Sequence, residues 1–228
     1  MSDYNCVDVS EWNKEIDWNK AKNDGVEYAF IRAGFGQDYE SQDDKYFYIN
    51  MENALKAGVK VGVYFYSYAK DFSSAISEAE HCIRLITPYK DKISFPIFYD
   101  VEEPSIESHI SETIPAFISY LNDKGFNAGV YCTTSWFDSY FKDISCDYFW
   151  FASWGPNDGK PHNKPQWADI WQYTSKGTVE GIGKNSVDLD ILYNTQMKLL
   201  IDEKKKIYIT VSAPEDCEVI CDIHKLGK

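Results

Sequence analysis

The sequence lacks a long apolar run, and it carries little positive charge. No stretch reaches the roughly 18 apolar residues that a membrane-spanning helix needs, so we expect no insertion into a membrane. The 228 residues include 36 acidic and 23 basic side chains, which gives a net charge of −13. Because a nucleic acid partner requires a basic surface, this charge argues against nucleic acid binding.

The sequence also lacks a secretory signal and the usual metal-binding spacings. Residues 1–5 are polar, and no apolar segment precedes the first expected strand, so we expect synthesis in the cytoplasm without a signal peptide. The six cysteines are scattered, which favours reduced thiols, although Cys217 and Cys221 are close enough in sequence to pair. No Cys-x-x-Cys or His-x-x-x-His spacing occurs, so we expect no metal site.

Aromatic residues are abundant, at 16% of the chain, with 17 Tyr and 7 Trp. Tyr and Trp rings have an apolar face and a polar edge, which suits the wall of a sugar-binding cleft. The alternative is that these rings only fill the core and cover ordinary surface. Composition alone does not separate the two interpretations.

Strand and helix patterns alternate along the chain. Five expected strands are each followed by an expected helix, and three further strands follow with short links. This order predicts an α/β fold, an irregular TIM-like β/α barrel of about five β/α units and three short-linked strands. The expected strands are 6–10, 26–33, 60–68, 95–102, 127–132, 148–154, 168–174 and 187–190, and the expected helices are 17–24, 44–57, 73–87, 111–124 and 134–141.

Acidic residues stand at the ends of several expected strands: Asp8, Asp100, Glu102 and Asp188. Barrel sites lie at the carboxyl ends of the strands, and closure brings the first strand beside the last. Acids gathered there repel one another and lose hydration, which costs stability and therefore suggests a functional role.

Asp100 and Glu102 are two residues apart on one strand, so their side chains point to the same face. Two such close carboxyl groups do not both ionise easily, and the pKa of one should rise. A raised pKa suits a general acid that protonates a glycosidic oxygen, and Glu102 has the longer reach. The alternative is that this Asp-Val-Glu segment merely ends a strand.

Seven segments together resemble glycoside hydrolase family 25, the muramidases found in phage endolysins and bacterial autolysins. The resemblance covers about residues 7–193 and implies an irregular β/α barrel without a metal or organic cofactor. It also implies cleavage of the β-1,4 bond between N-acetylmuramic acid and N-acetylglucosamine in bacterial peptidoglycan. The segments, in family order, are VDVSEWNKEIDW, VEYAFIRAGFG, VGVYFYSY, FPIFYDVE, WFASWG, DIWQYTSKG and VDLDILY.

The resemblance assigns roles to the four acids. Glu102 matches the general acid, and Asp8 and Asp100 match acids described as base, nucleophile or stabilising partner. Asp188 matches a fourth acid of the cleft and is preferred to Asp190 by alignment, although the two compete if both face the same side. Either Asp8 acts directly opposite Glu102, or the acetamido group of the substrate attacks while Asp100 stabilises it.

Other residues of these segments are expected to contact the sugar. For each, the alternative is ordinary filling of the barrel. Arg32 is expected to hold a site carboxylate through a charge-assisted hydrogen bond. The expected sugar contacts are Tyr64, Tyr131, Trp154, Gln172 and Tyr173.

Two rival functions stay open. One is a non-catalytic protein that binds cell-wall glycan on the same scaffold, and the other is a chitinase-like hydrolase of acetamido sugars. The first requires the loss of an essential acid, and none of the four is missing. The second usually has a longer acidic strand motif than FPIFYDVE.

The last part of the chain has a different pattern. A helix is expected at 191–206, and alternation in 207–228 predicts a β-hairpin. We therefore expect a catalytic barrel at 1–203 and a short β-rich tail at 204–228, either an appendage or part of a cell-wall-binding module. Because an isolated hairpin is marginally stable in water, the tail should pack on the barrel or mediate self-association. The missing signal peptide favours an endolysin-like route, with release from the cytoplasm onto the cell wall.

Overall fold

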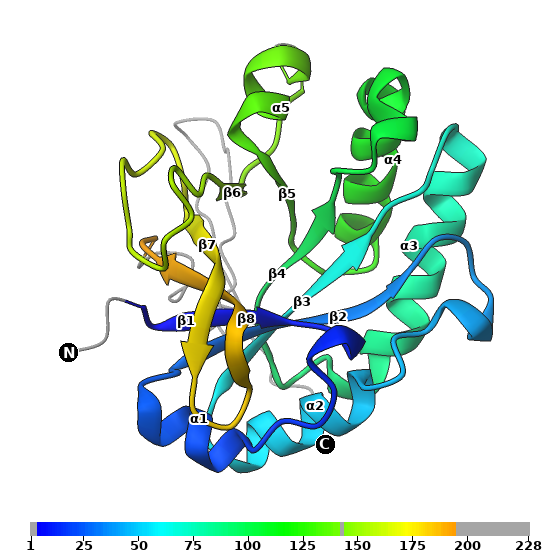
Figure 1. The fold of residues 1–228 in the computed structure, drawn as a ribbon. Coiled ribbons are helices and arrows are strands. Elements are labelled where there is room, and N and C mark those ends of the chain that lie inside the picture. Colours follow the sequence, from blue (N-terminus) through cyan, green and yellow to red (C-terminus); the bar gives the residue numbers. More distant parts are fainter. Residues whose placement is uncertain (1–3, 142–143, 195–228) are drawn as a thin grey trace, which may run out of the picture.

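The computed structural model describes residues 4–141 and 144–194, and these form a closed barrel of eight strands with helices outside it (Figure 1). The strands are β1 (Cys6–Val9), β2 (Tyr28–Phe35), β3 (Lys60–Tyr66), β4 (Ile93–Asp100), β5 (Ala128–Thr133), β6 (Phe149–Ala152), β7 (Ile170–Val179) and β8 (Gly183–Leu192). The α-helices are α1 (Trp18–Asp24), α2 (Phe47–Lys56), α3 (Phe72–Ile86), α4 (Ile110–Asp123) and α5 (Thr134–Tyr140). Short 3-10 helices are η1 (Glu11–Asn13), η2 (Glu40–Gln42), η3 (Thr87–Tyr89) and η4 (Pro104–His109).

The strands follow one another around the barrel in chain order. Neighbours from β1 to β7 are parallel, whereas β8 runs antiparallel to both β7 and β1 and closes the ring. The predicted irregular β/α barrel is therefore confirmed. A parallel neighbour requires a crossover connection, but β7 and β8 need only a tight turn, which explains the short link.

The closing strands are longer than the sequence pattern predicted. Strand β8 begins at Gly183 and continues through Ile191 and Leu192, which pair with Trp171 and Ile170 of β7. The prediction that a helix begins at 191 is therefore wrong, because pairing with β7 outweighs the local helical pattern. The rest of that predicted helix, the predicted hairpin and Cys217 and Cys221 lie outside the described residues, so the boundary at 203 stays a prediction.

Side chains on the two faces of the sheet form separate apolar clusters. On β2, for example, Ala29 and Ile31 face outward and join the large cluster under the helices, whereas Phe30 faces into the barrel. This alternation is the period of two expected of a strand. Within the described residues, no helix is both long and apolar enough to cross a membrane.

Glycines opposite large rings allow the barrel interior to close. Gly62 of β3 is paired with Phe30 of β2, and Gly129 of β5 is paired with Phe98 of β4. The indole of Trp150 packs against both of these phenyl rings, with its centroid 4.9 Å from that of Phe30 and 5.6 Å from that of Phe98. The interior of the barrel is thus a packed aromatic core, and it forms a floor beneath the end of the barrel at which the parallel strands end.

The substitution Gly62→Ala should destabilise the protein. A Cβ at this position would lie 2.3 Å from Cε1 of Phe30, and the ring of Phe30 is itself fully buried. Such overpacking typically costs about 1–3 kcal/mol, measurable as a lower free energy of unfolding in urea. The matched control is Gly183→Ala, where the nearest atom is Ser186 Oγ at 3.6 Å. Equal stability of the two variants would contradict this packing.

Candidate active site

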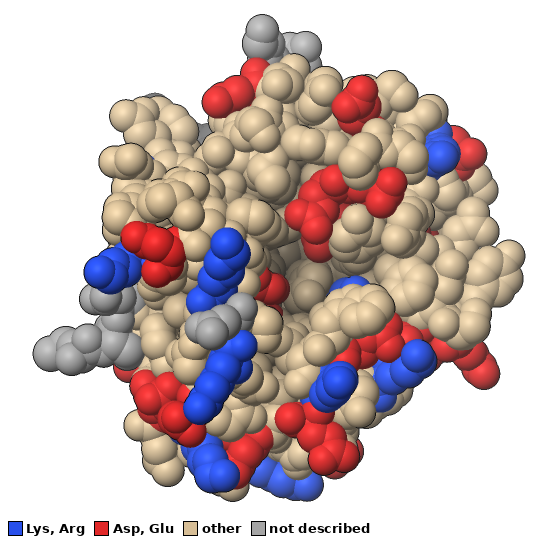
Figure 2. All heavy atoms as spheres, in the orientation of Figure 1, with Lys and Arg blue, Asp and Glu red and all other residues tan. Residues whose placement is uncertain are grey.

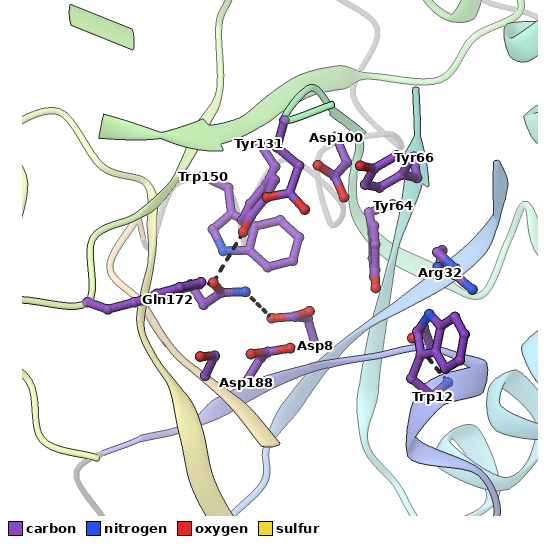
Figure 3. Close-up of a pocket in the computed structure, with 14 residues that line it drawn as sticks. Asp8, Trp12, Arg32, Tyr64, Tyr66, Asp100, Tyr131, Trp150, Gln172 and Asp188 are labelled. Atoms are coloured by element: carbon purple, nitrogen blue, oxygen red, sulfur yellow. Dashed lines mark hydrogen bonds between the residues drawn. The ribbon is translucent and has the colours of Figure 1, made fainter. Parts of the chain in front are cut away.

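A cavity of about 360 Å³ opens where the parallel strands end. It is visible as a hollow near the centre of the face shown in Figure 2, with acidic side chains at its edge. The residues that line it come from most of the strand ends and the loops that follow them (Figure 3). They are Asp8, Ser10, Trp12, Arg32, Tyr64, Tyr66, Asp100, Glu102, Tyr131, Trp150, Trp154, Gln172, Ser175 and Asp188.

Strand register places the acids around this cavity. Asp8 of β1 is paired with Asp188 of β8 across the seam that closes the barrel. Asp100 is the last residue of β4 and is paired with Tyr131 of β5. Glu102 lies two residues beyond the end of β4, not on the strand as predicted, and it still lines the cavity. The structure therefore brings together all four acids.

Gln172 links the acids on the two sides of the cavity. Its Nε2 donates to Oδ2 of Asp8 at 2.7 Å, and its Oε1 accepts from Nε1 of Trp154 at 2.8 Å and the hydroxyl of Tyr131 at 3.2 Å. The Tyr131 hydroxyl also forms a hydrogen bond with Glu102. These contacts give Gln172 a fixed amide orientation and connect Asp8 with the candidate general acid.

A fifth acid, Asp190, lies beneath the cavity. Its side chain is fully buried, and its Oδ1 accepts from Nε1 of Trp150 at 2.8 Å. Its carboxyl group lies beside that of Asp8, and burial together with the negative charge of Asp190 raises the pKa of Asp8. Asp188 and Asp190 therefore do face the same side of β8, but at different depths, and Asp188 is the one that lines the cavity. The two-residue spacing in VDLD was the signal for this arrangement.

Burial raises the pKa of every acid in this cluster. It raises the pKa of Asp8 and Asp100 well above the ordinary range, and the charges of Asp190 and Glu102, respectively, add to the effect. Burial, with the charges of Asp8 and Glu102, raises the pKa of Asp188 to about 9. The site therefore holds protons at neutral pH, which a general acid needs.

Glu102 differs from the deeper acids in its surroundings. Burial raises its pKa, the hydrogen bond with Tyr131 lowers it, and the charge of Glu103 raises it. Asp100 is only 4% exposed, whereas Glu102 is partly accessible. Glu102 is thus the carboxyl group of the pair that can reach a substrate in the cavity and release its proton more readily.

Arg32 lines the cavity, but its ionic partners differ from those predicted. Its Nε donates to Oδ2 of Asp44 at 2.9 Å, and its terminal nitrogen donates to Oε1 of Glu11 at 3.1 Å. The prediction that Arg32 holds one of the four site carboxylates is therefore wrong. The partners come from the loops after β1 and β2, whose contact depends on folding and not on sequence spacing.

The predicted aromatic contacts separate into two groups. Tyr64 and Tyr131 line the cavity from inside the barrel, where both rings contact Trp150. Trp154 lies at the rim and is 38% exposed. Tyr173 instead faces outward and packs in the cluster under the helices, so its predicted sugar contact is wrong. Its position next to Gln172 on β7 puts it on the opposite face of the strand.

Several lining residues were missed by the sequence analysis. Trp12, in η1 directly after β1, is 78% exposed at the cavity. Its place in DVSEW, just beyond a strand end that carries Asp8, was an available signal. Tyr66 and Trp150 also line the cavity. In residues 4–141 and 144–194, no group of three His, Cys, Asp or Glu side chains is arranged to hold a metal ion.

A β/α barrel with carboxyl groups around a cavity at its strand ends is an arrangement that glycoside hydrolases use. The model of the family described as Glycosyl hydrolases family 25 matches residues 7–182, and the chain belongs to this family.

Individual relatives agree with this assignment. An autolytic lysozyme of Clostridium acetobutylicum is 31% identical over 188 residues, which are 81% of this chain and 54% of that protein. The catalytic domain of an endolysin from a Listeria monocytogenes bacteriophage matches with a TM-score of 0.75 and 24% identity, over 86% of this chain and 95% of that one, and shows the likeness of fold. The modular autolysin LytC of Streptococcus pneumoniae, in complex with a synthetic peptidoglycan ligand, matches with a TM-score of 0.65 and 26% identity, over 82% of this chain and 46% of that one. The chain thus spans about half the length of the clostridial and pneumococcal relatives.

The variant Asp188→Asn should become more stable than the wild type as the pH rises. Between the ordinary carboxyl pKa near 4 and the raised value of about 9, the folded protein keeps a proton on Asp188 that the unfolded chain loses. Rising pH therefore destabilises the wild-type fold, and an amide, which does not ionise, removes this contribution. We expect the melting temperature of the variant to exceed that of the wild type by on the order of 5 °C at pH 9 and much less at pH 4.

The control is Asp91→Asn, which changes an exposed aspartate after η3. Its melting temperature should follow that of the wild type across the same pH range. A constant difference between Asp188→Asn and the wild type would show that Asp188 titrates normally.

Proposed function

We propose that this protein hydrolyses the β-1,4 bond between N-acetylmuramic acid and N-acetylglucosamine in peptidoglycan, with Glu102 as the general acid. The observation that carries the proposal is the pair of Asp100 and Glu102 at the end of β4, two neighbouring carboxyl groups with raised pKa values in an open cavity. The autolytic lysozyme and the autolysin with a peptidoglycan ligand support peptidoglycan as the substrate.

The first step is proton transfer from Glu102 to the glycosidic oxygen. The hydrogen bond with Tyr131 orients the Glu102 carboxyl group, and Tyr131 is itself tied to Gln172. As the bond between C1 and the glycosidic oxygen breaks, positive charge develops at the sugar carbon and must be stabilised. Either a protein carboxylate or the acetamido group of the substrate performs this task.

The surroundings of Asp8 and Asp100 favour participation of the acetamido group. Asp8 is 5% exposed, lies beside Asp190 and accepts from Gln172, so its carboxyl group is already engaged. Asp100 lies beside Glu102, and among the described residues its Oδ1 has no hydrogen-bond partner. We assign Asp100 to accept the acetamido N–H while the acetamido oxygen attacks C1.

Water completes the reaction. The attack by the acetamido oxygen forms a cyclic intermediate as the leaving sugar takes the proton from Glu102. Glu102, now a carboxylate, accepts a proton from water. The resulting hydroxide adds to C1 and breaks the bond between C1 and the acetamido oxygen, which opens the cyclic intermediate. Both protons are thereby accounted for, and the configuration at C1 is retained. Asp188, Trp154 and Trp12 are assigned to hold neighbouring sugar units at the cavity rim.

The variant Glu102→Gln should lower kcat by about 10²–10⁴-fold, because an amide of the same shape does not donate an acidic proton. Asp100→Asn and Asp8→Asn should each also lower kcat by at least tenfold. The control is Glu107→Gln in η4, an exposed glutamate that accepts from the hydroxyl of Tyr140. The measurement is release of new reducing ends from purified peptidoglycan, with thermal melts to show that each variant is folded.

Mass spectrometry of the digest identifies the bond. The proposal requires new reducing ends on muramic acid and full activity in Glu107→Gln. Rapid hydrolysis by Glu102→Gln would remove the general acid from the proposal. Binding of cell walls without new reducing ends would indicate a glycan-binding protein, and cleavage of chitin but not peptidoglycan would indicate a chitinase.

A further inference from the structure

A buried carboxyl group outside the barrel is not used by the reaction. Glu78 lies on α3, on the outer side of the sheet, and is 1% exposed. Its Oε1 accepts from the backbone N–H of Tyr68 at 2.8 Å. Its Oε2 accepts from the hydroxyl of Tyr99 at 2.5 Å and that of Ser67 at 3.0 Å. Every one of these partners is a donor, so the carboxyl group accepts at both of its oxygens.

The donors to Glu78 belong to the two strand ends that carry cavity residues. Ser67 and Tyr68 follow Tyr66, the last residue of β3, and Tyr99 directly precedes Asp100 on β4. The backbone N–H of Ser67 also donates to the carbonyl oxygen of Asp100 at 3.0 Å. Glu78 therefore contacts Tyr99, which precedes Asp100 on β4, and Ser67, whose backbone N–H binds the carbonyl oxygen of Asp100.

The backbone determines where the Asp100 carboxyl group lies. Oδ1 of Asp100 has no hydrogen-bond partner among the described residues, so no hydrogen bond of that atom fixes its place. Tyr99 and Asp100 point to opposite faces of β4, with Tyr99 held between Glu78 and the ring of Phe117, whose centroid is 3.8 Å away. A shift of Tyr99 along the strand would move Asp100 with it.

Glu78 is costly to keep where it is. Among the neighbouring side chains of α3, Ala75, Ala79 and Cys82 are apolar or small and fully buried, and the buried His81 interacts instead with Asp43 and the carbonyl oxygen of Gly36. Burial raises the pKa of Glu78 to about 7, even though the hydrogen bonds from Tyr99, Tyr68 and Ser67 lower it. An apolar side chain of similar size would fill the space without this cost.

We propose that Glu78 is a positioning residue for the reaction, which fixes the ends of β3 and β4 through Ser67, Tyr68 and Tyr99 and so sets Asp100 beside Glu102. This inference rests on the proposed hydrolysis. Catalysis depends steeply on such placement, because an error of about 1 Å in a reacting group can cost 10²-fold in rate. Glu78 touches neither the cavity nor the substrate, so its effect must pass through β4.

The experiment compares two hydrogen-bonded Glu–Tyr pairs whose glutamates both lie on α3. Glu78→Gln and Tyr99→Phe, alone and together, weaken the buried pair. Glu80→Gln and Tyr120→Phe weaken an exposed pair in which the Tyr120 hydroxyl donates to Oε1 of Glu80 at 2.9 Å. Steady-state kinetics on a soluble oligosaccharide of alternating N-acetylglucosamine and N-acetylmuramic acid gives kcat and KM for each variant.

We expect kcat to fall about tenfold or more in Glu78→Gln and in Tyr99→Phe, with KM within twofold of the wild-type value. The double variant should lose less than the sum of the two single variants, because both substitutions weaken the same hydrogen bond between Tyr99 and Glu78. Both variants of the exposed pair should keep the wild-type kcat. Wild-type kcat in Glu78→Gln, or additive losses in the double variant, would overturn the inference while leaving the proposed function intact.

Crystal structures of Glu78→Gln and Glu80→Gln provide a readout that does not depend on activity. The carboxyl group of Asp100 should be displaced relative to Glu102 in the first variant and unmoved in the second. An unmoved Asp100 in Glu78→Gln would overturn the inference even if the wild-type protein had no hydrolase activity. A wild-type protein without activity and a displaced Asp100 would instead overturn the proposed function alone.

Discussion

The structure depends on the burial of carboxyl groups at the seam where the barrel closes. Strand β8 runs antiparallel to β1, and this pairing sets Asp188 directly opposite Asp8. Asp190, two residues further along β8, lies beneath them beside Asp8 and accepts a hydrogen bond from Trp150. Three acids in so small a space are compatible with folding only because protons reduce their charge. The same burial raises the pKa of Glu102, the proposed general acid.

The aromatic core inside the barrel is in contact with the acids of the cavity above it. Trp150 packs against Phe30 and Phe98 below and donates to Asp190, so it joins the apolar core to the deepest acid. Beside Asp190, Asp8 accepts a hydrogen bond from Gln172, and Gln172 in turn accepts one from Trp154 at the cavity rim. Packing of the large apolar core offsets the cost of burying these acids.

Much of the barrel could be predicted from the sequence because its signals are local. Alternating strand and helix patterns gave the order of the elements, and acids at strand ends gave Asp8, Asp100, Glu102 and Asp188. Features that depend on long-range contact were predicted less well. Ile191 and Leu192 join a strand because β7 pairs with them, and Arg32 binds Asp44 and Glu11 because two loops meet. The depth of Asp190 and the outward direction of Tyr173 likewise follow from the closed barrel, not from motif spacing.

The central claim is that burial keeps protons on the carboxyl groups of the cavity near neutral pH. Its most direct test is a titration of carboxyl carbon chemical shifts by NMR on protein labelled with ¹³C in Asp and Glu, with signals assigned from single Asp→Asn and Glu→Gln variants. The structure predicts a midpoint near pH 9 for Asp188 and midpoints well above that of an exposed aspartate for Asp8 and Asp100. Midpoints near pH 4 for all three, the value of exposed carboxyl groups, would contradict it.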